Sequence, residues 1–143
     1  MNDRTRHGHD DSPPPRWDLE ERLLEFSAAI VNLTERLEPT RAGNHVGGQL
    51  LRSGTSPYFH HGEAEAAESR PDFIHKLGVC LKELRESQRA LRLIARVPLI
   101  DPPSAVEPLL RESDELIRIF NSSIRTARNR EVKEEPGQYR AGE

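Results

Sequence analysis

The chain has 143 residues, of which 34% are apolar and 31% charged, with a formal net charge of −3 and a single cysteine. This composition suits one helical domain and excludes collagen-like and disulfide-built folds. A lone cysteine supplies neither an internal disulfide nor a four-thiolate zinc site, and no apolar run approaches the roughly 20 residues that cross a bilayer. The N-terminus also lacks the apolar core of a signal peptide. We therefore expect a cytoplasmic protein that does not contact a membrane.

Both ends of the sequence are predicted to be disordered. Residues 1–15 place three consecutive prolines behind a polar lead, and residues 128–143 combine many charges with a proline and two glycines. Segments with so little apolar surface cannot offset the entropy that folding costs. The folded domain is accordingly predicted to span residues 16–127.

The first predicted helix runs from about Trp17 to Glu38. Its apolar residues recur at alternating steps of four and three, which is the pattern of a bundle core, and Pro39 cannot continue the helix. The predicted core side consists of Leu19, Leu23, Phe26, Ile30, Leu33 and Leu37.

The second predicted helix, from about Asn44 to Ala67, is expected to be kinked or interrupted. Its glycines lower helix propensity, and Pro57 removes a backbone donor from the interior of the segment. The same small residues predict that a neighbouring helix approaches closely. Its predicted buried side is formed by Val46, Leu50 and Leu51.

Two further helices complete the predicted fold. The third begins at Ser69, which forms a capping box with Asp72, and ends before Pro98. The fourth follows a breaker at residues 101–103, with Ser104 and Glu107 predicted to form a second capping box. Four amphipathic segments without strand-like alternation predict an all-α, antiparallel up-down-up-down four-helix bundle.

Three apolar residues of the first helix point away from its predicted core. Trp17, Leu24 and Val31 are seven residues apart and project about 140° from the centre of the core stripe. Because an outward stack of this kind marks a contact surface, it predicts an interface with other copies of the chain. The alternative is that Trp17 folds back on the end of the bundle and that the other two are tolerated in solvent.

Charge is segregated between helices. Residues 16–38 carry three basic and six acidic side chains, whereas residues 70–96 carry seven basic and three acidic. The third helix bears a basic ridge on the side opposite its core, formed by Lys82, Arg85, Arg89, Arg92 and Arg96. A weaker outward column follows on the fourth helix, formed by Arg111, Arg118 and Arg125.

The basic ridge has three possible partners. Its cations suit phosphates of RNA or DNA, the acidic first helix of a neighbouring copy, or solvent alone. Few aromatic residues accompany the cations, which argues against base stacking.

No residue pattern in the sequence predicts catalysis. His60, His61 and Glu63 lie close together, but the i, i+4 histidine pair with an intervening glutamate is absent. Cys80 falls on the core stripe of the third helix, where a thiol acts as a small apolar side chain. No phosphate-binding loop, serine elbow or di-iron motif occurs. We predict no enzyme activity, no metal, no cofactor and no small-molecule substrate; a metal-dependent enzyme built around His60 ranks third among the hypotheses.

The stretch from Gly48 to Ile94 resembles the four-helix-bundle proteins encoded in intervening sequences of bacterial 23S rRNA genes. The resemblance is carried by QLLRSGTS at residues 49–56, by Ser69 with Asp72 and Phe73, and by LKEL at residues 81–84. It implies an antiparallel bundle that forms a ring-like homo-oligomer, commonly a pentamer, with no established catalytic activity.

Two functional hypotheses follow. The first is a non-enzymatic homo-oligomeric scaffold or accessory protein, with the outward stack on the first helix in the subunit contact. The second is a module that binds RNA or DNA through a basic ridge repeated around the oligomer, so that several weak contacts add in avidity.

Overall fold

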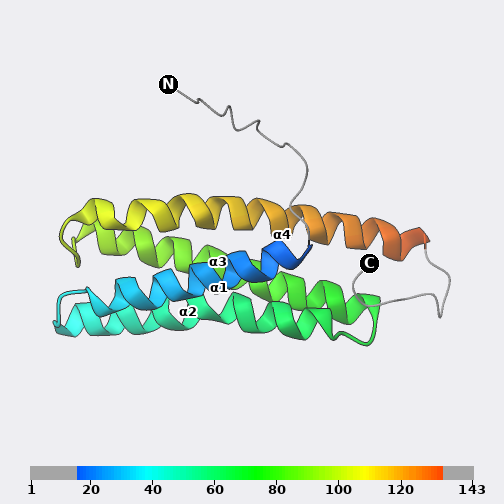
Figure 1. Ribbon diagram of the computed structural model, residues 1–143, viewed down its shortest axis with the longest axis horizontal. Coiled ribbons are helices and arrows are strands. Elements are labelled where there is room, and N and C mark those ends of the chain that lie inside the picture. The colour runs from blue at the N-terminus through cyan, green and yellow to red at the C-terminus, as the bar shows by residue number, and fades with distance from the viewer. Residues whose placement is uncertain (1–15, 134–143) are drawn as a thin grey trace, which may run out of the picture.

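Four long helices form the protein. The computed structural model describes residues 16–133, with side chains from residue 19 onward. The elements are α1 (Arg16–Glu35), α2 (Arg41–Glu65), α3 (Arg70–Arg96), the short 3-10 helix η1 (Pro103–Val106) and α4 (Glu107–Lys133). Each long helix packs against the next along the chain, and the described residues contain no strand (Figure 1). The predicted all-α up-down-up-down bundle is confirmed.

The predicted disorder at residues 1–15 and 134–143 lies outside the described residues. At the C-terminal end, α4 continues to Lys133, beyond the predicted domain boundary at residue 127. Arg130 and Lys133 lie in the last turn of α4, where positive charge stabilises the negative end of the helix dipole. This favourable charge placement explains why the helix continues although it buries little there.

The interior is formed by the apolar stripes that the sequence predicts. On α1, Leu19 is half-buried and the remaining predicted core residues are buried. The side chains that are completely buried include Leu23, Ile30, Leu50, Cys80, Leu84, Leu91, Leu116 and Phe120. All four helices therefore contribute to a single core.

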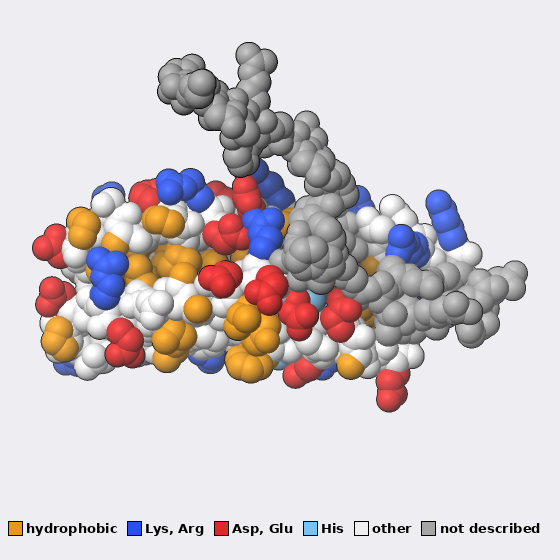
Figure 2. All heavy atoms as spheres, viewed as in Figure 1, with side chains coloured by type: hydrophobic (Ala, Val, Ile, Leu, Met, Phe, Trp, Pro, Cys, Tyr) orange, Lys and Arg blue, Asp and Glu red, His pale blue; other side chains and the backbone are white. Residues whose placement is uncertain are grey.

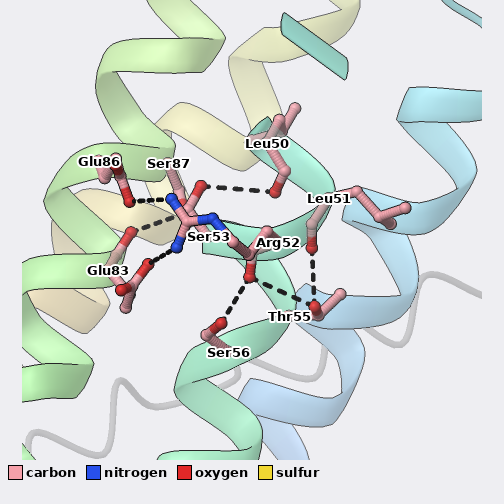
Figure 3. A network of polar contacts seen from close by, with 9 residues as sticks. All are labelled: Leu50, Leu51, Arg52, Ser53, Thr55, Ser56, Glu83, Glu86 and Ser87. Carbon is pink, nitrogen blue, oxygen red and sulfur yellow. Dashed lines mark hydrogen bonds and ion pairs between the residues drawn. The ribbon is translucent and has the colours of Figure 1, made fainter. Parts of the chain in front are cut away.

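The prediction of an interrupted second helix is wrong, because α2 is continuous from Arg41 to Glu65 and contains Pro57. Its small residues act as predicted: a Cβ atom on Gly54 would lie 2.7 Å from Ile30 Cγ2 of α1, so the two backbones approach closely. Hydroxyl groups bond to carbonyls in the turn before the proline, with Thr55 Oγ1 donating to Leu51 O at 2.7 Å and Ser56 Oγ to Arg52 O at 2.6 Å (Figure 3). Packing and these local bonds offset the low helix propensity.

Side-chain caps fix two of the helix starts. Ser69 Oγ accepts from the backbone N–H of Asp72 at 3.2 Å, which confirms the predicted cap of α3. Thr40 Oγ1 accepts from Gly43 N–H at 3.0 Å at the start of α2. The predicted capping box at Ser104 is wrong: Ala105 N–H bonds to Pro102 O at 3.0 Å, so Ser104 lies inside the turn of η1 rather than at a helix start.

Two connections meet at one end of the bundle. The backbone N–H of Glu38, between α1 and α2, donates to Leu99 O at 3.0 Å, between α3 and α4. Leu99 and Ile100 are buried there and close that end of the core. Within the described residues, none of the helices combines the length and the apolar character needed to span a bilayer.

Candidate interaction surfaces

An apolar strip lies along the outer side of α1 and α2. On α1, Leu24 and Val31 are 41% and 39% exposed, whereas the side chain of Trp17 lies outside the described residues. On α2, Leu51 is 39% and Phe59 65% exposed. We call these four exposed side chains, Leu24, Val31, Leu51 and Phe59, the apolar strip. Figure 2 shows hydrophobic side chains gathered on the face that α1 and α2 present.

Sequence reasoning does not identify the α2 half of this strip. The prediction that Leu51 shares the buried side of Leu50 is wrong, and Phe59 has no predicted role. Leu51 is one residue, or about 100° of helix rotation, from the fully buried Leu50, so the two face different surroundings. The signal that could identify the α2 half is the eight-residue spacing of Leu51 and Phe59, slightly more than two helical turns.

A groove separates α1 from α4. It has a volume of about 690 Å³. Its apolar floor is formed by Phe26, Ala29, Leu33, Ala105, Pro108 and Leu109. Its polar rim is formed by Glu21, Arg22, Glu25, Asn32, Arg36 and Glu112. The groove exists because α1 packs extensively on α2 but only sparsely on α4, so an apolar seam stays open on the same view as the strip (Figure 2).

A single arginine joins the two sides of the groove. Arg22 Nη2 lies 2.7 Å from Glu112 Oε1 and 2.6 Å from Glu115 Oε2, and its Nε donates to Glu112 Oε1 at 3.0 Å. Glu21 and Glu25 on the same rim are exposed and pair with no cation among the described side chains. The rim therefore presents uncompensated negative charge near the N-terminal end of α1.

The basic ridge of α3 faces solvent along its whole length. Lys82, Arg85, Arg89, Arg92 and Arg96 are all exposed. Apart from Lys82, whose charge acts on Glu86, the ridge side chains form no hydrogen bond or ion pair with any described residue. Arg111, Arg118 and Arg125 of α4 are exposed as well. The ridge is thus available to a partner outside the chain.

A different cation, Arg52 of α2, is occupied by its own chain. Its guanidinium bonds Glu83 Oε2 at 3.0 Å and Glu86 Oε2 at 2.7 Å on α3 (Figure 3). The hydrogen bond from Arg52 lowers the pKa of the Glu86 carboxyl. Beneath this surface pair, the buried hydroxyls of Ser87 and Ser53 are 3.1 Å apart. This network joins α2 to α3 and has a structural role.

The histidines near the end of α2 do not form a metal centre. His60 Nδ1 lies 3.2 Å from Glu63 Oε2, which also accepts from Lys76 Nζ at 3.2 Å. The hydrogen bond with His60, and then that with Lys76, lowers the pKa of Glu63. His61 is buried and packs edge-on against Phe120, with ring centres 6.3 Å apart. No group of three or more potential ligands suited to a metal occurs among the described residues.

Cys80 lies in the core between helices. It is completely buried, and its thiol is 3.6 Å from Pro57 O. Burial raises the pKa of the Cys80 thiol to about 12, so the reactive thiolate is scarce at neutral pH. The thiol therefore fills space beside the proline of α2.

These features define an antiparallel four-helix bundle whose exposed surfaces offer contacts and whose described residues show no catalytic grouping. A solved structure from Bacteroides thetaiotaomicron VPI-5482 is similar to it, with a TM-score of 0.68 and 37% sequence identity over 74% of this chain and 97% of that one. That protein is described as one of unknown function from the S23 ribosomal protein family. The chain belongs to this family, the 23S rRNA intervening-sequence proteins, which confirms the resemblance in the sequence. No protein-family model and no curated protein matches the chain.

Proposed function

We propose that the protein is a non-enzymatic scaffold or accessory protein of the cytoplasm that assembles with copies of itself. The observation that carries the proposal is the apolar strip, because four partly exposed apolar side chains on two adjacent helices form a surface typical of an interface. The family resemblance favours a ring, commonly of five copies. A closed ring covers the same surface on every copy, which is how soluble homo-oligomers ordinarily avoid open-ended growth.

Light scattering at micromolar concentration tests this proposal. We expect a mass that is a multiple of the 16.3 kDa chain mass. Replacing Leu24 and Val31 together by glutamine should weaken association by about 10- to 100-fold, since an apolar interface side chain commonly contributes more than about 1 kcal/mol. The matched control is Leu93→Gln on α3, which removes a side chain of similar exposure, 49%, from a different face. A monomeric parent protein would reject the proposal.

A second candidate function is binding of RNA or DNA through the basic ridge. It is supported by the four ridge arginines that have no partner among the described residues. Phosphate contacts release counterions, so affinity for labelled RNA should be highest at low salt and fall steeply as salt is added. In an oligomer, the repeated ridge would add avidity.

The ridge is tested by removing its charge without disturbing the core. The triple variant Arg85→Gln, Arg89→Gln, Arg92→Gln should lower RNA affinity and reduce the salt slope by about 0.9 for each phosphate that is no longer neutralised. The control removes equal charge elsewhere, with Arg36→Gln, Arg41→Gln and Arg130→Gln, all at exposed positions. Absence of binding by the parent protein at low salt would exclude this function, and equal losses in both triple variants would exclude the ridge as the site.

A further inference from the structure

The two uncovered apolar surfaces of the bundle flank the same helix. The apolar strip lies where α1 meets α2, and the α1–α4 groove lies on the other side of α1. The strip projects outward, with Phe59 65% exposed, whereas the groove is concave with an apolar floor. One surface therefore has the shape that the other lacks.

The strip and the groove also occupy the same stretch of the bundle. Gly54 of α2 lies opposite Ile30 of α1, so in this antiparallel pair Phe59, five residues further on, lies level with residue 25. Arg22 of α1 lies opposite Glu112 of α4, so Leu109, three residues earlier, is also level with residue 25. Phe59 is thus at the height of Leu109 on the groove floor. Rotation about an axis parallel to the bundle preserves such heights.

The charges around the two surfaces are opposite. Residues 41–62 of α2 contain no carboxylate but include Arg41, His45 and Arg52. The groove rim carries the unpaired carboxylates of Glu21 and Glu25. These carboxylates repel phosphates, so the groove suits a positive protein surface better than a nucleic acid.

We propose that the apolar strip of one copy packs into the α1–α4 groove of the next copy, with Phe59 placed against the groove wall near Pro108. The inference rests on the self-association proposed above and specifies which surfaces meet. The contact is head-to-tail, because the strip and the groove are different surfaces. A two-fold contact between two strips would leave the groove of each copy uncovered.

The positions of the surfaces also determine how the assembly closes. In the cross-section of a four-helix bundle, the α1–α2 side and the α1–α4 side are adjacent, so their outward directions differ by about a quarter turn. Each copy is then rotated by about a quarter turn relative to the one before it, and head-to-tail contacts with such a rotation form a small ring rather than a filament. The α1 helices line the inside of this ring.

Cysteine cross-linking tests the pairing. The double variant Phe59→Cys, Pro108→Cys is treated with a short bismaleimide, and both positions are exposed in the single chain. Cys80 is retained because it is completely buried. We expect a ladder of cross-linked multimers from the double variant and essentially none from either single variant. The matched control Phe59→Cys, Arg89→Cys places the second thiol on the basic ridge and should give no ladder.

The outcomes separate this inference from the proposed function. If light scattering shows an oligomer but the double variant gives no ladder, the pairing of strip and groove is wrong while self-association stands. Cross-linked dimers from a single variant, which indicate a two-fold contact, also overturn the pairing. A monomer by light scattering overturns both proposals together.

Discussion

The close approach of α1 and α2 predicts opposite effects for two glycine-to-alanine changes in the same helix. Gly48 is exposed, and a Cβ atom there meets nothing within 4 Å. Gly54 faces Ile30, and a Cβ atom there would lie 2.7 to 2.8 Å from two side-chain carbons of a residue that is itself 0% exposed. The two substitutions have the same chemistry, so their difference isolates the packing.

The magnitudes follow from helix propensity and overpacking. Alanine is about 0.8–1.0 kcal/mol more favourable than glycine inside a helix, so Gly48→Ala should raise the free energy of unfolding by nearly that amount. Gly54→Ala gains the same propensity but strains a filled core, at a cost of roughly 1–3 kcal/mol. We expect Gly54→Ala to be less stable than Gly48→Ala by about that cost.

Urea denaturation of both variants at one protein concentration measures this difference. A fixed concentration is needed because self-association contributes to apparent stability. Equal stabilisation by the two alanines would refute the close packing of α1 on α2. The continuity of α2 through a glycine-rich segment would then lack a physical cause.

Three further predictions concern single side chains. The Oγ atom of Ser27 is buried without a hydrogen-bond partner among the described residues, so Ser27→Ala should stabilise the fold by about 1–3 kcal/mol in urea denaturation, whereas Ser122→Ala at an exposed position should change it little. Cys80 should resist a thiol reagent at pH 8 and react on unfolding; rapid labelling of the native protein would contradict its burial. The pKa of Glu86 is lowered by Arg52, so this pair stabilises the fold above the pKa of an unfolded glutamate and loses its effect as pH falls through the lowered value. Glu86→Gln should therefore flatten the acid side of the stability profile, and an unchanged profile would show that the ion pair contributes nothing.

Sequence periodicity predicts the helices well where one face is buried. The core stripe of α1 and the Ser69 cap of α3 follow from local patterns, and both are found in the structure. Pro57 and the glycines of α2 favour an interruption that does not occur, since their low propensity is overcome by contacts with another helix. A partner 24 residues away, such as Ile30 for Gly54, is not visible in a local pattern.

The candidate surfaces are predictable to different degrees. Outward spacing identifies Leu24, Val31 and the basic ridge, because an exposed face of a helix depends only on that helix and its core side. The groove cannot be predicted in this way, because it depends on how far α1 and α4 lie apart, and that distance is set by the packing of the whole bundle.

The loose attachment of α1 to α4 has a consequence for local opening. One long side of α1 is held by the tight packing on α2, but the other is joined to α4 mainly through the Arg22 guanidinium. Opening of a helix begins where few buried contacts must break, so the backbone amides of α1 should exchange with deuterium sooner than those of α3, which packs on two neighbours. A second chain seated over α1 would slow that exchange, and the degree of protection along this one helix would then report how fully the protein is assembled.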